Sequence, residues 1–97
     1  MTKTDEFIEK IEQLDQHLKV QKYDNVDSYD YEQVSMIVWY VIDDGKLPVV
    51  TFTYYNDIPV IEAEHVRFDK AGFALYSKAI KVCSDYFSCF YLREDYL

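Results

Sequence analysis

Three apolar segments follow one another in the middle of the chain, at residues 34–42, 47–55 and 58–66. Each is rich in β-branched and aromatic side chains, which favour strands. The dipeptides Asp44-Gly45 and Asn56-Asp57 separate the segments, and such pairs favour tight hairpin turns because their residues tolerate positive φ. This pattern predicts a three-stranded antiparallel meander, and it constrains the fold more than any other feature of the chain.

Two-residue turns at these dipeptides would determine which side chains share a face of the sheet, because side chains alternate along a strand. The predicted buried face consists of Ile37, Trp39, Val41, Val50, Phe52, Ile61 and Ala63, and the opposite, wetter face of Thr51, Thr53, Glu62 and Glu64. Pro48 conflicts with this register, since it has no amide hydrogen and its position should donate to Val41. A bulge or a longer first turn would shift the pairing there.

An amphipathic helix is predicted before the meander, over residues 4–20. Its apolar positions, spaced by three and four residues, are Phe7, Ile11, Leu14 and Leu18. Thr4 is expected to cap its start, and Lys19 and Lys22 lie near the negative end of its dipole. A connection at residues 20–33, rich in turn-forming Asp, Asn and Ser, is predicted to lead from this helix to the meander.

A second helix is predicted after the meander, over residues 69–92, with Asp69 at its start. Its apolar stripe, which should pack on the sheet, contains Phe73, Tyr76, Ile80, Cys83, Phe87 and Phe90. Ser84-Asp85 leaves open whether the segment forms one helix or two.

The predicted fold class is therefore α+β, with a single domain over residues 1–97 and the element order α-β-β-β-α. A three-stranded antiparallel β-meander forms one layer. The N-terminal helix and one or two C-terminal helices pack on one face of the sheet as the second layer.

Charge excludes several function classes. Eighteen acidic residues against ten basic ones give a formal net charge of −8. A protein that binds nucleic acid directly needs a basic footprint to displace phosphate counterions, so direct binding of DNA or RNA is not expected. The chain also has no polybasic cluster for anionic lipid, no apolar signal core and no apolar run that spans a bilayer. A cytoplasmic protein is expected.

Catalytic and metal chemistry are not predicted. Cys83 and Cys89 are six residues apart on the expected second helix, which turns them to opposite sides, so buried free thiols are favoured over a disulfide. No local pattern brings either cysteine to a histidine, as a nucleophile pair would require. Near His65, strand alternation places Glu62 and Glu64 on the other face. We expect no cofactor, no metal and no enzymatic activity.

Acidic side chains and tyrosines occur together in the connection, at the turns and on the third strand. The predicted partner-binding residues are Tyr23, Asp24, Asp27, Tyr29, Asp30, Tyr31, Glu32, Asp43, Asp44, Asp57, Glu62 and Glu64. Carboxylates on a rigid scaffold can occupy the positions that nucleic-acid phosphates take in a basic cleft, and tyrosines add contact area. The alternative is that the acidity serves only solubility.

In size, acidity, tyrosine–acid interleaving and element order, the chain resembles phage-encoded anti-CRISPR proteins that mimic DNA. It is also similar to acidic immunity proteins and antitoxins that plug nuclease active sites. The resemblance covers the whole chain in architecture and carries over no functional residue. It implies a stoichiometric inhibitor that docks on the basic channel of a nuclease or CRISPR effector.

Two other functions remain open from the sequence. In a self-associating or adaptor module, Tyr91, Tyr96 and Leu97 would supply a homodimer face. In an enzyme, His65 would act together with the nearby carboxylates.

Overall fold

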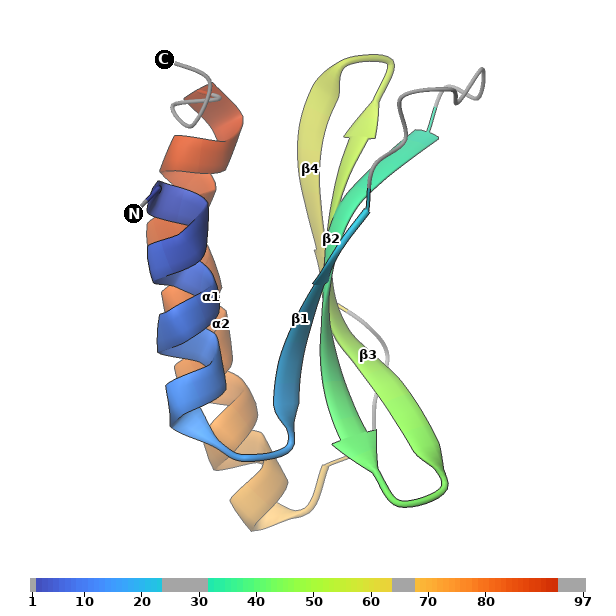
Figure 1. Ribbon diagram of the computed structural model, residues 1–97, viewed down its shortest axis with the longest axis vertical. Coiled ribbons are helices and arrows are strands. Elements are labelled where there is room, and N and C mark those ends of the chain that lie inside the picture. The colour runs from blue at the N-terminus through green and yellow to red at the C-terminus, as the bar shows by residue number, and fades with distance from the viewer. Residues whose placement is uncertain (1, 24–31, 64–67, 93–97) are drawn as a thin grey trace.

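The computed structural model describes residues 2–23, 32–63 and 68–92. Its elements are α1 (Lys3–Leu14), β1 (Leu18–Lys22), β2 (Glu32–Ile42), β3 (Gly45–Tyr55), β4 (Ile58–Ala63) and α2 (Lys70–Leu92). The strands form one antiparallel sheet in the order β1-β2-β3-β4. Figure 1 shows both helices on the same side of the sheet. The α+β class and the two layers are as predicted, but the sheet has four strands where the sequence pattern predicted three.

The additional strand, β1, occupies residues that the sequence pattern assigned to the first helix and to the connection. The helix ends at Leu14, and Asp15 has an extended backbone, with φ −163° and ψ 144°. The Asp15 carboxylate accepts the backbone N–H of His17 at 2.8 Å, a local hydrogen bond that competes with helix. Leu18 and Val20 then face the core as alternate residues of a strand. Lys19 and Lys22 therefore lie on β1 and not in the last turn of the helix, and Lys22 pairs with Asp5 in its first turn.

The first helix is capped two residues before its predicted cap. Thr2 is the N-cap: its hydroxyl accepts the Asp5 backbone N–H at 3.0 Å, and the Asp5 carboxylate accepts the Thr2 backbone N–H at 3.3 Å. Thr4, the predicted cap, lies inside the helix and its hydroxyl forms a 2.7 Å hydrogen bond with that of Tyr86.

Removal of the Thr2 cap should destabilise the protein measurably. We expect Thr2→Ala to lower the free energy of unfolding by about 0.5–2 kcal/mol, because it leaves a helix N–H without its acceptor. Thr2→Ser keeps the hydroxyl and should stay close to the parent. Urea unfolding followed by circular dichroism measures both, and equal losses for the two variants would contradict the role of the hydroxyl.

The β3–β4 hairpin has the predicted register. Tyr55 pairs with Ile58 and Phe52 with Ile61. The two-residue turn contains Asn56 and Asp57 at φ 49° and 67°, the left-handed region that a primed hairpin turn requires. Phe52 and Ile61 both pack in or against the core, as the sequence pattern predicted.

The β2–β3 hairpin differs from the predicted register. Ile42 pairs with Gly45, so the turn consists of Asp43 and Asp44 and not of Asp44 and Gly45. The pairing then shifts between Val38, which opposes Val50, and Trp39, which opposes Pro48. The irregularity expected near Pro48 is thus present as a bulge.

This bulge changes which residues of β2 are buried. Met36 and Val38 oppose Phe52 and Val50 and belong to the buried core. The predicted buried set Ile37, Trp39 and Val41 was wrong, because a shift of one residue moves a strand's side chains to the other face.

The core lies between the sheet and the two helices, with Phe52 at its centre. The Phe52 ring makes edge-on contacts with Phe7 of α1 and with Tyr86 and Phe90 of α2, at centroid distances of 5.4, 5.7 and 5.1 Å. α2 is one continuous helix through Ser84 and Asp85.

The stripe of α2 that packs on the sheet differs in part from the predicted one. Cys83 and Phe90 are buried as predicted, together with Ala79 and Tyr86, but the side chain of Phe73 is 58% exposed. Asp69 precedes the helix and accepts the backbone N–H of Gly72 through its carboxylate, which confirms the predicted helix start.

Candidate protein-binding surface

The predicted partner-binding residues fall at three places in the structure. Tyr23, Asp43, Asp44, Asp57 and Glu62 have described positions, and Glu32 is described as the first residue of β2. The others lie outside the described residues: Asp24, Asp27, Tyr29, Asp30, Tyr31 and Glu64.

The residues that flank the acidic connection, Tyr23 and Glu32, lie at one end of the sheet. Tyr23 donates its backbone N–H to the carbonyl of Ser35 at 2.8 Å, which fixes the residue before position 24 beside β2. Glu32 pairs with Tyr55, and the Asn56–Asp57 turn follows Tyr55 directly. Both ends of the segment 24–31 and the carboxylate of Asp57 therefore belong to one end of the sheet, which we call the loop end.

The loop end is strongly acidic by composition. Residues 24–32 read DNVDSYDYE and contain four acids and no base, to which the turn adds Asp57. In the described part of the chain, the ion pairs are Lys22–Asp5, Lys81–Asp85 and His17–Asp15, so none of them involves Asp57.

Asp43 and Asp44 lie at the opposite end of the sheet, in the β2–β3 turn. β3 is 11 residues long. At a rise of about 3.3 Å per residue, this strand separates the two turns by roughly 30 Å. Both side chains are exposed, and neither forms an ion pair within the described residues. The predicted acidic residues thus do not form one continuous patch.

Glu62 belongs to the sheet face that neither helix covers, which we call the open sheet face. From the register, this face carries Lys19, Gln21, Ile37, Trp39, Val41, Lys46, Pro48, Thr51, Thr53, Tyr55, Ile58, Val60 and Glu62. The Tyr55 hydroxyl donates a hydrogen bond to the Glu62 carboxylate. The two residues lie on either side of the Thr53–Val60 pair, and Thr53 itself is fully buried. Glu62 is therefore a half-buried, hydrogen-bonded carboxylate.

The open sheet face also carries a polar and aromatic cluster that the sequence pattern did not predict. The Gln21 side-chain oxygen accepts hydrogen bonds from Trp39 Nε1 at 3.0 Å, from the Tyr23 hydroxyl at 2.8 Å and from Lys46 Nζ at 3.3 Å. Lys46 Nζ also lies 4.2 Å from the centroid of the Trp39 ring, a cation–π contact. Trp39 was predicted to be buried in the core, so its position in this cluster depends on the bulge beside Pro48.

Metal-binding side chains do not cluster in the described structure. Residues 2–23, 32–63 and 68–92 contain no group of three His, Cys, Asp or Glu side chains that could hold a metal ion. His65 lies outside these residues. His17 stacks on Tyr40 and contacts the Asp15 carboxylate through Nδ1 at 2.8 Å. These contacts hold the histidine in place without offering it a nucleophile.

Cys83 is a buried free thiol, as the sequence analysis expected, and burial raises its pKa to about 12. Since the thiolate is the reactive form, a thiol with a raised pKa is mostly protonated and unreactive below that pH. We expect Cys83 in a Cys89→Ser variant to react with a thiol reagent at pH 8 at least about 100-fold more slowly than in urea. Rapid labelling of the folded variant would contradict this burial.

No family model, no curated protein and no solved structure matches this chain. Within the described residues, neither helix is long and apolar enough to cross a lipid bilayer.

Proposed function

We propose that this protein is a non-catalytic inhibitor that binds the basic nucleic-acid-binding cleft of a nuclease or another nucleic-acid-handling protein. The observation that supports this proposal best is the meeting of Tyr23, Glu32 and the Asp57 turn at the loop end. This arrangement attaches the most acidic segment of the chain to a rigid sheet at both of its ends.

The physical basis of the proposed inhibition is electrostatic. Carboxylates at the loop end take the place of phosphates in the cleft, and opposite charge accelerates the encounter. Tyrosines interleaved with these acids, Tyr29 and Tyr31, add contact area at a low cost in side-chain entropy. The mode of action is steric blockage of the cleft, which requires no reacting group on the inhibitor.

Affinity capture with a salt gradient tests this function. The immobilised protein should retain a basic nucleic-acid-binding protein from a lysate of the host cell and release it only as salt rises, because added salt screens the attraction. Double-stranded DNA should displace the same protein by competing for its cleft. Retention that neither salt nor DNA weakens would contradict a phosphate-like contact.

Self-association is a second candidate function, and the open sheet face favours it. Ile37, Trp39 and Val60 lie on this face with no helix over them, and the side chain of Ile58 is 62% exposed. The apolar side chains of this mixed face can be buried against a second copy of the same face. In this alternative the acidity serves solubility only.

Two neighbouring residues provide a matched test of self-association. The side chains of Val41 and Ile42 are 37% and 43% exposed, but strand alternation turns only Val41 to the open sheet face. If copies associate through that face, Val41→Lys should weaken the association at least about tenfold, whereas Ile42→Lys should leave it unchanged. Sedimentation velocity measures both, and a monomer at every concentration would rule out this function.

A further inference from the structure

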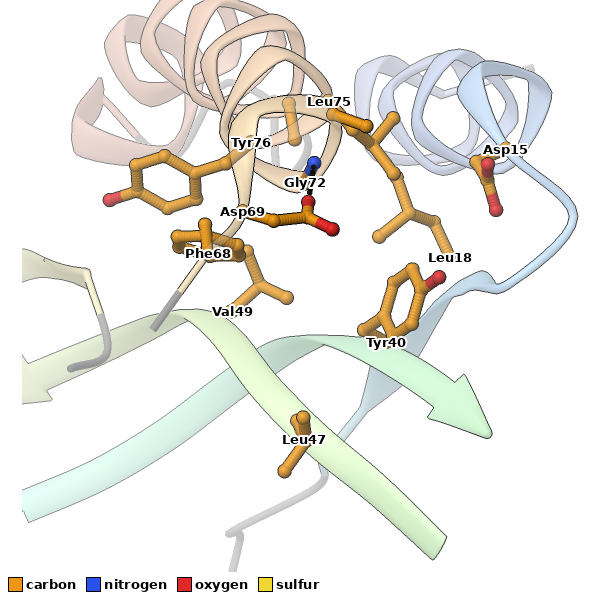
Figure 2. Close-up of a pocket in the computed structure, with 12 residues that line it drawn as sticks. Asp15, Leu18, Tyr40, Leu47, Val49, Phe68, Asp69, Gly72, Leu75 and Tyr76 are labelled. Atoms are coloured by element: carbon orange, nitrogen blue, oxygen red, sulfur yellow. Dashed lines mark hydrogen bonds between the residues drawn. The ribbon is translucent and has the colours of Figure 1, made fainter. Parts of the chain in front are cut away.

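A cavity of about 480 Å³ lies between the start of α2 and the sheet, away from the loop end. Figure 2 shows side chains from four parts of the fold around it: the α1–β1 corner, β2, β3 and the beginning of α2. Its volume is within the range typical of small-molecule sites. Of the predicted partner-binding residues that the structure describes, none lines this cavity.

The cavity wall is mainly apolar and aromatic. Leu18, Val49 and Leu75 supply aliphatic surface, and Tyr40, Phe68 and Tyr76 supply aromatic rings. The rings of Phe68 and Tyr76 are 4.8 Å apart between centroids. Such a wall binds the apolar body of a ligand, and ring faces also attract a positive charge.

Among the described residues, the charged ones in the lining are both carboxylates, Asp15 and Asp69. Asp69 Oδ1 accepts the backbone N–H of Gly72 at 2.7 Å, and Figure 2 shows this carboxylate directed into the space beside Phe68. Asp15 Oδ1 accepts the backbone N–H of His17, and the hydrogen bonds from the His17 backbone and ring lower the pKa of Asp15. Within the described residues, two carboxylates and no basic side chain therefore line the cavity.

We propose that this cavity binds a small organic cation with an apolar body, such as an arylalkyl ammonium ion. The apolar part fills the space between Leu18, Val49 and Leu75, and the cationic head lies between the aromatic rings and Asp69. The positive end of the α2 dipole offsets part of the Asp69 charge, so the carboxylate and the rings act together. This site is independent of the proposed inhibitory function, because it lies away from the loop end.

Three matched probes test the charge preference: 2-phenylethylammonium, uncharged 2-phenylethanol and anionic 3-phenylpropanoate. Each is added to the full chain while NMR follows the resonances of Leu18, Val49 and Leu75. We expect saturable shifts with the ammonium ion and affinities at least about tenfold weaker for the other two probes.

Two variants identify the carboxylate. Asp69→Asn keeps an oxygen that accepts the Gly72 N–H, since Asn caps helices as well as Asp does, and removes only the charge. It should weaken ammonium binding about tenfold. Asp57→Asn removes the same charge from the exposed turn at the loop end and should leave binding unchanged.

Three results would overturn the proposal. Equal binding of 2-phenylethanol would indicate a purely apolar cavity, and tighter binding of 3-phenylpropanoate would indicate an anion site at the start of α2. Absence of saturable shifts with all three probes would mean that the cavity is not a ligand site. Capture of a nucleic-acid-binding protein through the loop end could succeed or fail in each case, so the two proposals are tested separately.

Discussion

Replacement of Phe52 by alanine is expected to lower the free energy of unfolding by about 3–5 kcal/mol, the usual cost of deleting a buried phenylalanine ring. Phe52 is fully buried and contacts aromatic rings of both helices. Its loss removes the side chain that joins α1 and α2 to the sheet. Since a small domain is stable by only about 5–15 kcal/mol, much of the variant should be unfolded at moderate urea concentrations.

Phe73→Ala is the matched control for this prediction. The same ring is removed from α2, but at a position where the side chain is 58% exposed. We expect a loss below about 1 kcal/mol, because little apolar surface returns to water. Urea unfolding of both variants provides the measurement, and similar midpoints for the two would contradict the central position of Phe52.

The double substitution Asp27→Lys/Asp30→Lys is expected to abolish inhibition while the fold stays intact. It reverses two charges within the acidic segment at the loop end. Each substitution replaces an attraction to the basic cleft with a repulsion from it. Because close charge pairs across interfaces couple by about 1.5–7 kcal/mol, the affinity for the partner should fall at least about 100-fold. Calorimetric titration against the captured partner measures this change.

Asp43→Lys/Asp44→Lys is the control for the same change in net charge. These residues form the exposed turn at the other end of the sheet. If net charge alone attracted the partner, both double variants would lose affinity equally. If the loop end is the contact surface, the 43/44 variant should retain affinity within about fivefold, a reduction due only to weaker long-range steering. Unchanged inhibition by the 27/30 variant would reject the loop end as the contact surface.

The turn and register of the β3–β4 hairpin could be predicted because their signals are local. Its burial could not, since Ala63 is exposed where the pattern predicted burial, and Thr51 and Thr53 are buried where it predicted a wetter face. Asn56 and Asp57 tolerate the left-handed conformation, and the alternation on both sides of the turn sets Phe52 opposite Ile61. The start of α2 was also predictable, since Asp69 caps it through a hydrogen bond three residues ahead.

β1 was missed because its residues fit two periodicities. Leu14 and Leu18 are four residues apart, which continues the helical spacing of Phe7 and Ile11, while Leu18 and Val20 also alternate as in a strand. The deciding interaction is the Asp15 carboxylate accepting the His17 N–H, which ends the helix. The spacing of apolar residues cannot predict a local side-chain hydrogen bond of this kind.

The faces of β2 could not be predicted because both alternating sets of its side chains are apolar. Only the bulge next to Pro48 selects Met36 and Val38 for the core and turns Trp39 outward. Pro48 did signal the irregularity, but not its exact position or direction. The cluster around Gln21 therefore could not be derived from the sequence.

The candidate surface was predictable in composition but not in arrangement. Sequence identifies the acids of 24–32, Asp43 and Asp57, whereas the strand pairing determines that Asp57 joins the loop end and Asp43 does not. Glu62 was predicted to be a partner-binding carboxylate on the wetter face, whereas the structure has it accepting a hydrogen bond from the Tyr55 hydroxyl.

Hydrogen–deuterium exchange of the free and partner-bound protein tests the central claim most directly. If the loop end is the contact surface, slowed exchange on binding should be confined to residues 24–32 and to the Asn56–Asp57 turn. Protection of β1 and β2 across the open sheet face, with residues 24–32 unchanged, would contradict the inhibitory mode proposed for this protein.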